Sequence, residues 1–166
     1  MQFDLACNLI WSTYYGGSGM DSGNEIATDA LGVNVYVTGD SDSPNLTTVN
    51  SAGFYQAANA GGTSDIFILG FNAGALNWAT YYGGMGYDLA QDIGVDKAGN
   101  IFVAGGTSST ALTTQSPPGG TYFQGTYGGG IGDIFILEFN PSTSLIWGTY
   151  YGGAFEDNPF GLHVNG

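Results

Sequence analysis

The chain has 166 residues, 43% of them hydrophobic and 14% aromatic, and its fourteen acidic residues face a single basic residue, Lys97, for a net charge of −13. That hydrophobic content excludes a disordered acidic polymer and is sufficient for the core of one ordinary domain. With one lysine and no arginine the surface cannot neutralise a phosphate backbone, which excludes nucleic acid as a partner, and no apolar run reaches the roughly 18 residues of a membrane span, so no membrane insertion is expected.

Short runs rich in Val, Ile, Phe and Tyr and bounded by Gly, Asn and Asp follow one another along the chain, which predicts β-strands. After a first run at residues 1–4, a complete set lies at residues 25–29, 34–39, 65–71 and 76–82. Short connections, DALGVN between the first two runs of the set and NAGALN between the last two, predict antiparallel hairpins. No segment has a 3.6-residue apolar period of helical length, so essentially no helix is expected.

The same set of motifs returns further along the chain. WSTYYGG at residues 11–17 recurs as WATYYGG at 78–84 and as WGTYYGG at 147–153, at spacings of 67 and 69 residues. DIFILGFN at 65–72 recurs as DIFILEFN at 133–140, an offset of 68 residues. Each repeat is therefore predicted to be a four-stranded antiparallel meander, which buries both of its faces only by stacking on its neighbours.

These boundaries divide the chain into tandem units of the β-propeller-blade type. Residues 1–17 are a partial blade made of an outer strand pair, 18–84 a first complete blade, 85–153 a second, and 154–166 the first strand of a next blade. The predicted fold class is all-β, with four-stranded antiparallel β-propeller-type blades in tandem, two complete and two partial, and essentially no helix.

The motifs W(S/A/G)TYYGG, VYVTG and DIFI closely resemble the seven-bladed β-propeller repeat family of secreted and cell-surface proteins from bacteria and some archaea. The resemblance covers nearly the whole chain. It implies a propeller architecture and an extracellular or cell-surface location, and it implies no set of catalytic residues.

Two complete blades are fewer than the roughly four or more that a closed propeller needs. Exposed sheet edges at both ends favour association, either with the remaining blades of a longer chain or with further copies of this chain. Head-to-tail joining that completes a blade between two chains without closing a ring gives a filament. The residues expected to carry this assembly are Phe3, Phe160, Leu162 and Val164.

An aspartate follows each YYGG motif in a glycine-rich loop, at Asp21, Asp88 and Asp157. Together with Asp65 and Asp133, these aspartates would form rings of carboxylates on one face, suited to Ca²⁺, which prefers oxygen ligands. The alternative is that each carboxylate accepts backbone N–H bonds within its own turn.

The DSDSPN segment is the densest cluster of oxygen-bearing side chains. Asp40 and Asp42 in this segment are a second candidate Ca²⁺ site, although the segment lacks the glycine and the distal glutamate of an EF-hand and is equally typical of a solvated loop. Asn45, in the sequence Asn-Leu-Thr, fits the N-glycosylation pattern. No cofactor is required by any motif, and Ca²⁺ is the only candidate.

Each YYGG motif carries two tyrosines that point to opposite faces of a strand, which would leave one of each pair exposed. Because exposed aromatic rings stack on sugars, Tyr15, Tyr82 and Tyr151 are candidate glycan-binding residues. The alternative is that these rings fill the core between stacked blades.

His163 is the only histidine and Cys7 the only cysteine, and neither lies near a nucleophile motif, so the sequence does not predict an enzyme. The leading hypothesis is a non-enzymatic extracellular structural or adhesive module, a filament subunit joined head to tail by blades completed between chains. The alternative is a lectin-like propeller module that binds glycans, with or without Ca²⁺.

Overall fold

The computed structural model describes residues 1–120 and 122–164, and within them the chain forms ten β-strands and no helix. The strands are β1 (Gln2–Phe3), β2 (Leu9–Trp11), β3 (Asp21–Thr28), β4 (Asn34–Ser41), β5 (Asp65–Asn72), β6 (Ala75–Tyr82), β7 (Asp88–Val95), β8 (Ile101–Thr107), β9 (Asp133–Phe139) and β10 (Leu145–Tyr151). The described residues therefore include no helix long and apolar enough to cross a membrane. The all-β prediction is confirmed.

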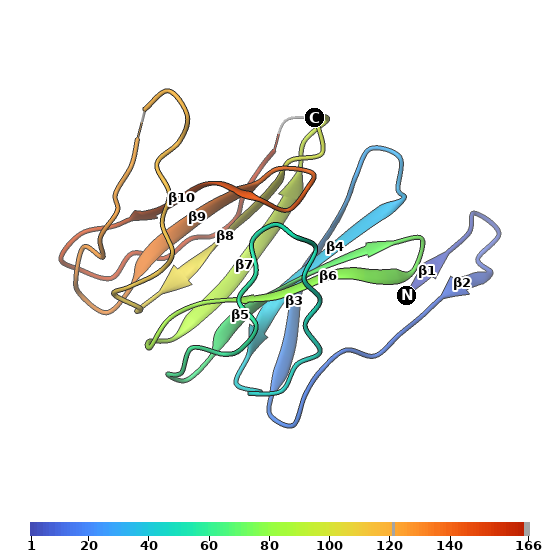
Figure 1. Ribbon diagram of the computed structural model, residues 1–166, viewed down its shortest axis with the longest axis horizontal. Helices are drawn as coiled ribbons and strands as arrows, with labels where there is room; N and C mark the ends of the chain where they lie inside the picture. Colours follow the sequence, from blue (N-terminus) through green and yellow to red (C-terminus); the bar gives the residue numbers. More distant parts are fainter. Residues whose placement is uncertain (121, 165–166) are drawn as a thin grey trace.

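The strands form two four-stranded antiparallel sheets and one short hairpin (Figure 1). The first sheet has the order β3-β4-β5-β6, the second has the order β10-β9-β8-β7, and β1 pairs with β2. Neighbours in each sheet are neighbours in the chain, as short hairpin connections require. β3 begins at Asp21, four residues before the predicted strand, because a bulge between Gly23 and Glu25 lets the strand continue its pairing with β4.

The C-terminal segment differs from its prediction. A first strand of a next blade was expected in residues 154–166, but residues 154–164 form no strand, and residues 165–166 lie outside the described residues. β3 and β7 take their hydrogen bonds from the second strand of their own sheet, and the described structure offers no such strand to this segment. The segment lies instead against β7, where the Leu162 N–H donates to the Asp92 carboxylate at 2.7 Å.

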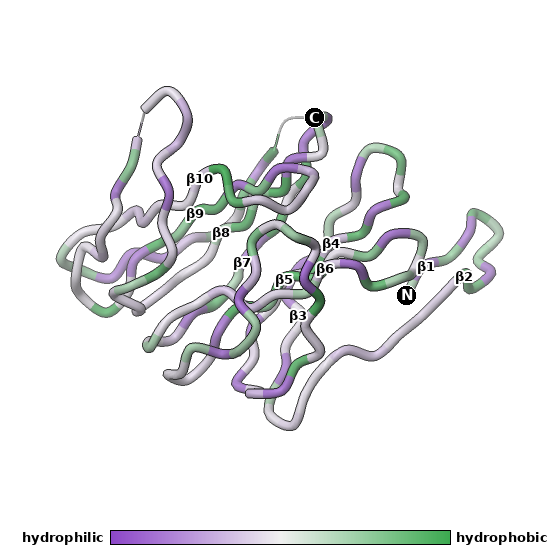
Figure 2. Tube along the Cα trace, in the orientation of Figure 1, coloured by the Kyte–Doolittle hydropathy of each residue, from purple (hydrophilic) through white to green (hydrophobic). Residues whose placement is uncertain are grey.

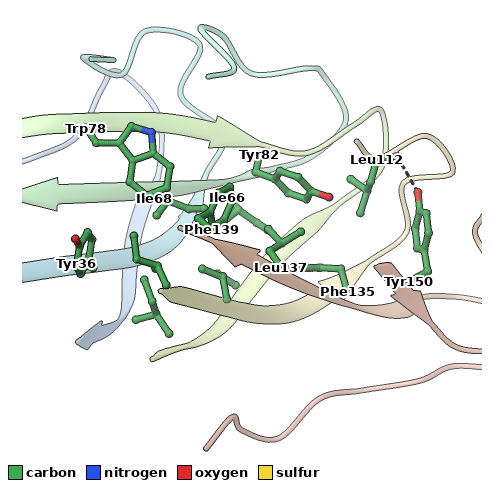
Figure 3. Packing of buried hydrophobic residues seen from close by; sticks show 14 residues of the cluster. Tyr36, Ile66, Ile68, Trp78, Tyr82, Leu112, Phe135, Leu137, Phe139 and Tyr150 are labelled. Atoms are coloured by element: carbon green, nitrogen blue, oxygen red, sulfur yellow. Dashed lines mark hydrogen bonds between the residues drawn. The ribbon is translucent and has the colours of Figure 1, made fainter. Parts of the chain in front are cut away.

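The core lies between the sheets, and hydrophobic stretches follow the strands (Figure 2). Trp78 on β6 packs edge-on against Phe139 on β9, with ring centroids 5.3 Å apart. Tyr82, which lies further along β6 on the same face, is 5.9 Å from Phe135 (Figure 3). Because these four rings come from different sheets, each sheet buries one face by covering its neighbour.

The β1–β2 hairpin packs on the other face of the first sheet in the same way. Trp11 lies 5.3 Å from Phe71, and Tyr15 lies 5.6 Å from Phe67. The tryptophan and second tyrosine of the first two Trp-x-Thr-Tyr-Tyr motifs therefore contact the two phenylalanines of the third strand in the following sheet. The hairpin therefore stacks on the first sheet as the first sheet stacks on the second, and we call this shared arrangement the stacking rule.

The long loops between the second and third strands run along the outer edge of each sheet. Val49 exchanges two backbone hydrogen bonds with Ala79 on β6, and Gln115 exchanges two with Gly148 on β10. These contacts, with the Tyr81 and Tyr150 N–H groups that donate to the Gln56 and Gln124 carbonyls, occupy part of the outward backbone groups of the outermost strand. The loops thus protect the two sheet edges that would otherwise be open to further pairing.

Gly105 in β8 is required by close packing. A Cβ at this position would lie 2.0 Å from the Leu89 carbonyl oxygen and 2.6 Å from the Phe135 ring. We expect Gly105→Ala to lower the free energy of unfolding by about 1–3 kcal/mol through overpacking, measured by urea denaturation. Gly23→Ala is the matched control, since a Cβ there meets nothing within 4 Å. An equal loss in the two variants would contradict the packing argument.

Candidate functional site

The two sheets differ in how completely their third strands are buried. β5 is buried at seven consecutive positions, from Asp65 to Phe71, because both of its faces are covered. β9 carries nearly the same sequence, yet its burial alternates between buried and half-buried positions. One face of the second sheet therefore lacks the cover that the same face of the first sheet has. We call it the open face.

The open face is built from residues that form an interior face in the first sheet. Ile134, Ile136, Trp147 and Tyr151 stand at the positions of Ile66, Ile68, Trp78 and Tyr82. Tyr82 is 1% exposed and Tyr151 is 53% exposed. The apolar composition of this face is thus explained by its place in the repeat, and its exposure by the lack of a following sheet among the described residues.

The open face carries two acidic side chains, Asp92 on β7, which accepts the Leu162 N–H, and Glu138 on β9. Glu138 occupies the position of Gly70, the residue that admits the Tyr36 and Trp78 side chains in the first sheet. Burial, followed by repulsion from Asp96, raises the pKa of Glu138. Because Glu138 pairs with Trp147 across β9 and β10, a sheet that covers this face must accommodate its carboxylate.

The C-terminal segment covers the part of the open face formed by β7, β8 and β9, which we call the inner half. The part around β10 and Tyr122 is the outer half. A shallow hollow in the inner half is lined by Ala104, Ile134, Ile136, Pro159, Phe160 and Leu162. Val164 also lies in this region, with its Cγ2 atom 2.6 Å from the Cβ position of Gly94. Of the four predicted assembly residues, Leu162 and Val164 are half-buried here, Phe160 is exposed, and Phe3 lies at the opposite end of the molecule, on β1.

The tyrosines predicted to bind glycans are not equivalent. The Tyr82 hydroxyl donates to the Thr113 carbonyl at 2.8 Å, in the loop of the next sheet, and the Tyr15 hydroxyl donates to the Thr47 carbonyl at 2.9 Å. Burial raises the pKa of both hydroxyls. Tyr82 is fully buried and Tyr15 is half-buried between sheets, so the glycan prediction is corrected for both, and only Tyr151 has an exposed ring.

A pair of buried carboxylates lies beside Gly83 in the interface of the two sheets. Asp88 accepts from the Gly84 N–H and the Ser109 hydroxyl, each at 2.8 Å, and from the Thr107 hydroxyl. Asp65 accepts from the Gln56 amide at 3.0 Å and the Ala60 N–H at 2.7 Å through Oδ2, while its buried Oδ1 has no partner among the described residues.

The environment of these two carboxylates favours their neutral forms. A Cβ on Gly83 would lie 2.7 Å from Asp65 Oδ1 and 2.8 Å from Asp88 Oδ2, so the two groups flank one glycine. Burial, together with the nearby charge of Asp88, raises the pKa of Asp65 to about 6. Burial also raises the pKa of Asp88.

The constellation is repeated at the end of the second sheet. Asp133 is buried, accepts from the Gly128 N–H at 2.6 Å, and has an unpartnered Oδ1 within the described structure. A Cβ on Gly152 would lie 2.6 Å from Asp133 Oδ1 and 2.8 Å from Asp157 Oδ2. The repeat thus places an aspartate pair around the first glycine of both the second and the third YYGG motif.

The remaining candidate metal ligands are held by hydrogen bonds, most of them from the paired strand or the turn beside it. Asp21 is half-buried, and although burial raises its pKa, bonds from Ser41, Gly17 and Ser43 outweigh that effect and lower it overall. Asp40 accepts from the Asn24 amide at 2.8 Å, and Asp42 accepts from the Met20 N–H at 2.6 Å. Within residues 1–120 and 122–164 no three acidic, histidine or cysteine side chains are grouped as metal ligands.

Asn45, the predicted glycosylation site, lies exposed in the long loop of the first sheet. Its amide oxygen accepts from the N–H and the hydroxyl of Ser18, at 2.9 and 3.0 Å. The side chain therefore links this loop to the YYGG turn.

The fold and the stacking rule define the class of the chain, a tandem array of β-propeller-type blades. The model of the β-propeller repeat family matches residues 10–46 and 77–112, and no curated protein matches the chain. Each matched segment begins at a Trp-x-Thr-Tyr-Tyr motif and runs through the first two strands of the following sheet. The matches support a place among β-propeller repeat proteins.

Proposed function

We propose that this chain is a non-enzymatic structural module whose role is to stack blades into a longer assembly. The observation that carries the proposal is the open face of β9 and β10, which repeats an interior face of the first sheet and yet stays half-exposed. A further blade is the cover that fits this face. The proposed source of that blade is another copy of the chain, and the remaining blades of a longer chain are the alternative cover.

Face-to-face packing, rather than strand pairing alone, is the proposed way of joining. In both sheets the first strand pairs only with the second, and β1 and β2 correspond to the third and fourth strands. The C-terminal segment of one copy and the β1–β2 hairpin of the next therefore share one composite blade without being hydrogen-bonded neighbours. Side chains between blades must supply the affinity.

The net charge of −13 opposes self-association, because two copies repel each other at long range. Salt screens this repulsion, so assembly should strengthen with ionic strength. Measuring assembly in Ca²⁺ and in Na⁺ at the same ionic strength separates specific binding of Ca²⁺ from screening of the net charge. A calcium effect beyond screening would assign a role to the aspartate loops.

The first experiment measures assembly by sedimentation and light scattering over a concentration series, with negative-stain electron microscopy at the highest concentrations. We expect concentration-dependent growth into linear particles at physiological ionic strength. A monomer at every concentration would overturn the proposal and leave the remaining blades of a longer chain as the cover.

Removal of residues 160–166 tests the contribution of the C-terminal segment. This deletion takes away Phe160, Leu162 and Val164 from the inner half of the open face, and we expect association to weaken about tenfold or more. Unfolding of the truncated chain in urea serves as the control for an intact second sheet. Unchanged assembly would show that the segment has no part in joining.

We also propose that the module acts outside the cell. The proposal rests on the resemblance of its motifs to secreted seven-bladed repeats, and the single lysine, with no arginine, leaves one site for trypsin-like proteases.

Glycan binding is the second candidate function, favoured by the exposed ring of Tyr151, which lies 5.5 Å from Tyr122. A glycan array compares the wild-type chain with Tyr151→Ala, for which we expect binding to be lost. A signal that does not depend on the saccharide would reject this candidate.

A further inference from the structure

The interface between the two sheets provides a template for what covers the open face. In that interface the β9–β10 hairpin lies over the first sheet, and its Thr143 carbonyl accepts the Phe54 N–H at 2.8 Å. The Phe54 carbonyl in turn accepts the Trp78 indole N–H at 3.1 Å. The Phe139 ring packs against both residues, with its centroid 5.9 Å from that of Phe54 and 5.3 Å from that of Trp78.

The β1–β2 hairpin has the same turn as the β9–β10 hairpin. Asp4 and Asn140 stand at equivalent positions, and each side-chain oxygen accepts the N–H groups two and four residues further on. Cys7 and Thr143 both adopt the left-handed conformation, with φ of 62° and 63°. The Cys7 carbonyl is therefore carried on a turn of the same shape as that of Thr143.

The outer face of the β1–β2 hairpin is free. Phe3 and Phe139 are equivalent, because each stands the same distance before the tryptophan of its hairpin, Trp11 or Trp147. Gln2 pairs with Trp11, so the next residue, Phe3, lies on the opposite face of the hairpin. It is 53% exposed, whereas Phe139 is fully buried. The tip residues around Leu5 are exposed and hydrophobic as well (Figure 2).

The outer half of the open face has the complementary groups. Tyr122 stands at the position of Phe54, packs on Tyr151 as Phe54 packs on Tyr82, and is 46% exposed. The Trp147 indole N–H is buried without a partner among the described residues, whereas that of Trp78 is bonded through Phe54.

We propose that the β1–β2 hairpin of a second copy docks on the outer half of the open face, with Phe3 between Trp147 and Tyr122 and the Cys7 carbonyl facing the Tyr122 N–H. The inference rests on the proposed function and names the partner surface. It continues an interface already present in the chain, since the hairpin's opposite face packs on its own first sheet through Trp11.

Phe3→Asp tests the docking mode. Phe3 contacts no core cluster, so the variant should keep the unfolding transition of the wild-type chain, while self-association weakens about tenfold or more. Met85→Asp is the matched control, because it adds the same charge at an exposed residue of the β6–β7 turn and should leave association unchanged.

A cross-link tests the same contact directly. Asn77 and Thr143 line one groove of the internal interface, and their equivalents are Ile146 and Cys7. Ile146→Cys treated with a short bifunctional thiol reagent should give a ladder of covalent oligomers through the native Cys7. Thr63→Cys, at the other end of the strands, should give none beyond random collision.

The outcomes separate the two proposals. Wild-type association that persists in Phe3→Asp, with no ladder from Ile146→Cys, would overturn this docking mode and leave the structural role in place. A wild-type chain that never associates would overturn both.

Discussion

Trp78→Ala is expected to lower the free energy of unfolding by about 3–5 kcal/mol, the range for deleting a fully buried aromatic side chain. Trp78 is 1% exposed, contacts Phe139 and donates its indole N–H to the Phe54 carbonyl. Its loss leaves a cavity between the sheets and an unpaired carbonyl, and neither sheet can close the gap without moving against the other.

Trp147→Ala is the matched control, since the same residue stands at the same place of the next repeat. Trp147 is only half-buried on the open face, so its removal should cost the isolated chain less than half as much. Urea denaturation at low protein concentration measures both. Equal losses would mean that the open face is covered in solution, and the two sheets would then not differ as described.

The comparison of the two tryptophans also shows what the sequence could predict. The repeat of Trp-Thr-Tyr-Tyr and DIFI determined the strands, their antiparallel order and the blade type, because each motif encodes a local pattern. The C-terminal segment was predicted as a strand from the same pattern, but a strand also needs a hydrogen-bonding neighbour. The β-strand propensity of residues 160–164 was therefore not enough to form a strand.

The site was less predictable than the fold. The alternation of Tyr14 and Tyr15 could not tell which ring faces the next sheet, and both Tyr15 and Tyr82 proved to lie between sheets. The partner of Asp65 was missed, although Phe54-Tyr55-Gln56 recurs as Tyr122-Phe123-Gln124 in the sequence. The recurrence of this tripeptide could have indicated that Gln56 donates to Asp65 and that the Phe54 carbonyl accepts from Trp78.

Stability is expected to fall as the pH rises from about 4 to about 6, and the buried carboxylate of Asp65 is the main cause. Burial raises its pKa in the folded chain to about 6 from the ordinary value of 3.8. The folded state therefore binds this proton more tightly than the unfolded state does. The resulting stabilisation is complete below the unfolded pKa and is lost as the pH rises through the folded pKa.

The size of this effect follows from the shift, at about 1.4 kcal/mol for each pKa unit, giving roughly 3 kcal/mol between pH 4 and pH 7. Asp88 and Asp133, whose pKa values are also raised by burial, act in the same direction. No basic side chain offsets the charges, because Lys97, the sole lysine, is exposed on the β7–β8 turn.

Asp65→Asn isolates the contribution of this one group. The amide stays uncharged at every pH, so the variant should match the wild-type chain near pH 4, show a flatter profile between pH 4 and pH 6, and be the more stable of the two at pH 8. Urea denaturation across this range measures the difference, with Glu156→Gln as the control that removes one exposed charge. Parallel profiles for Asp65→Asn and the wild-type chain would show that the carboxylate is ionised throughout, and the absence of a partner at Oδ1 would then have to be met by a bound cation or water.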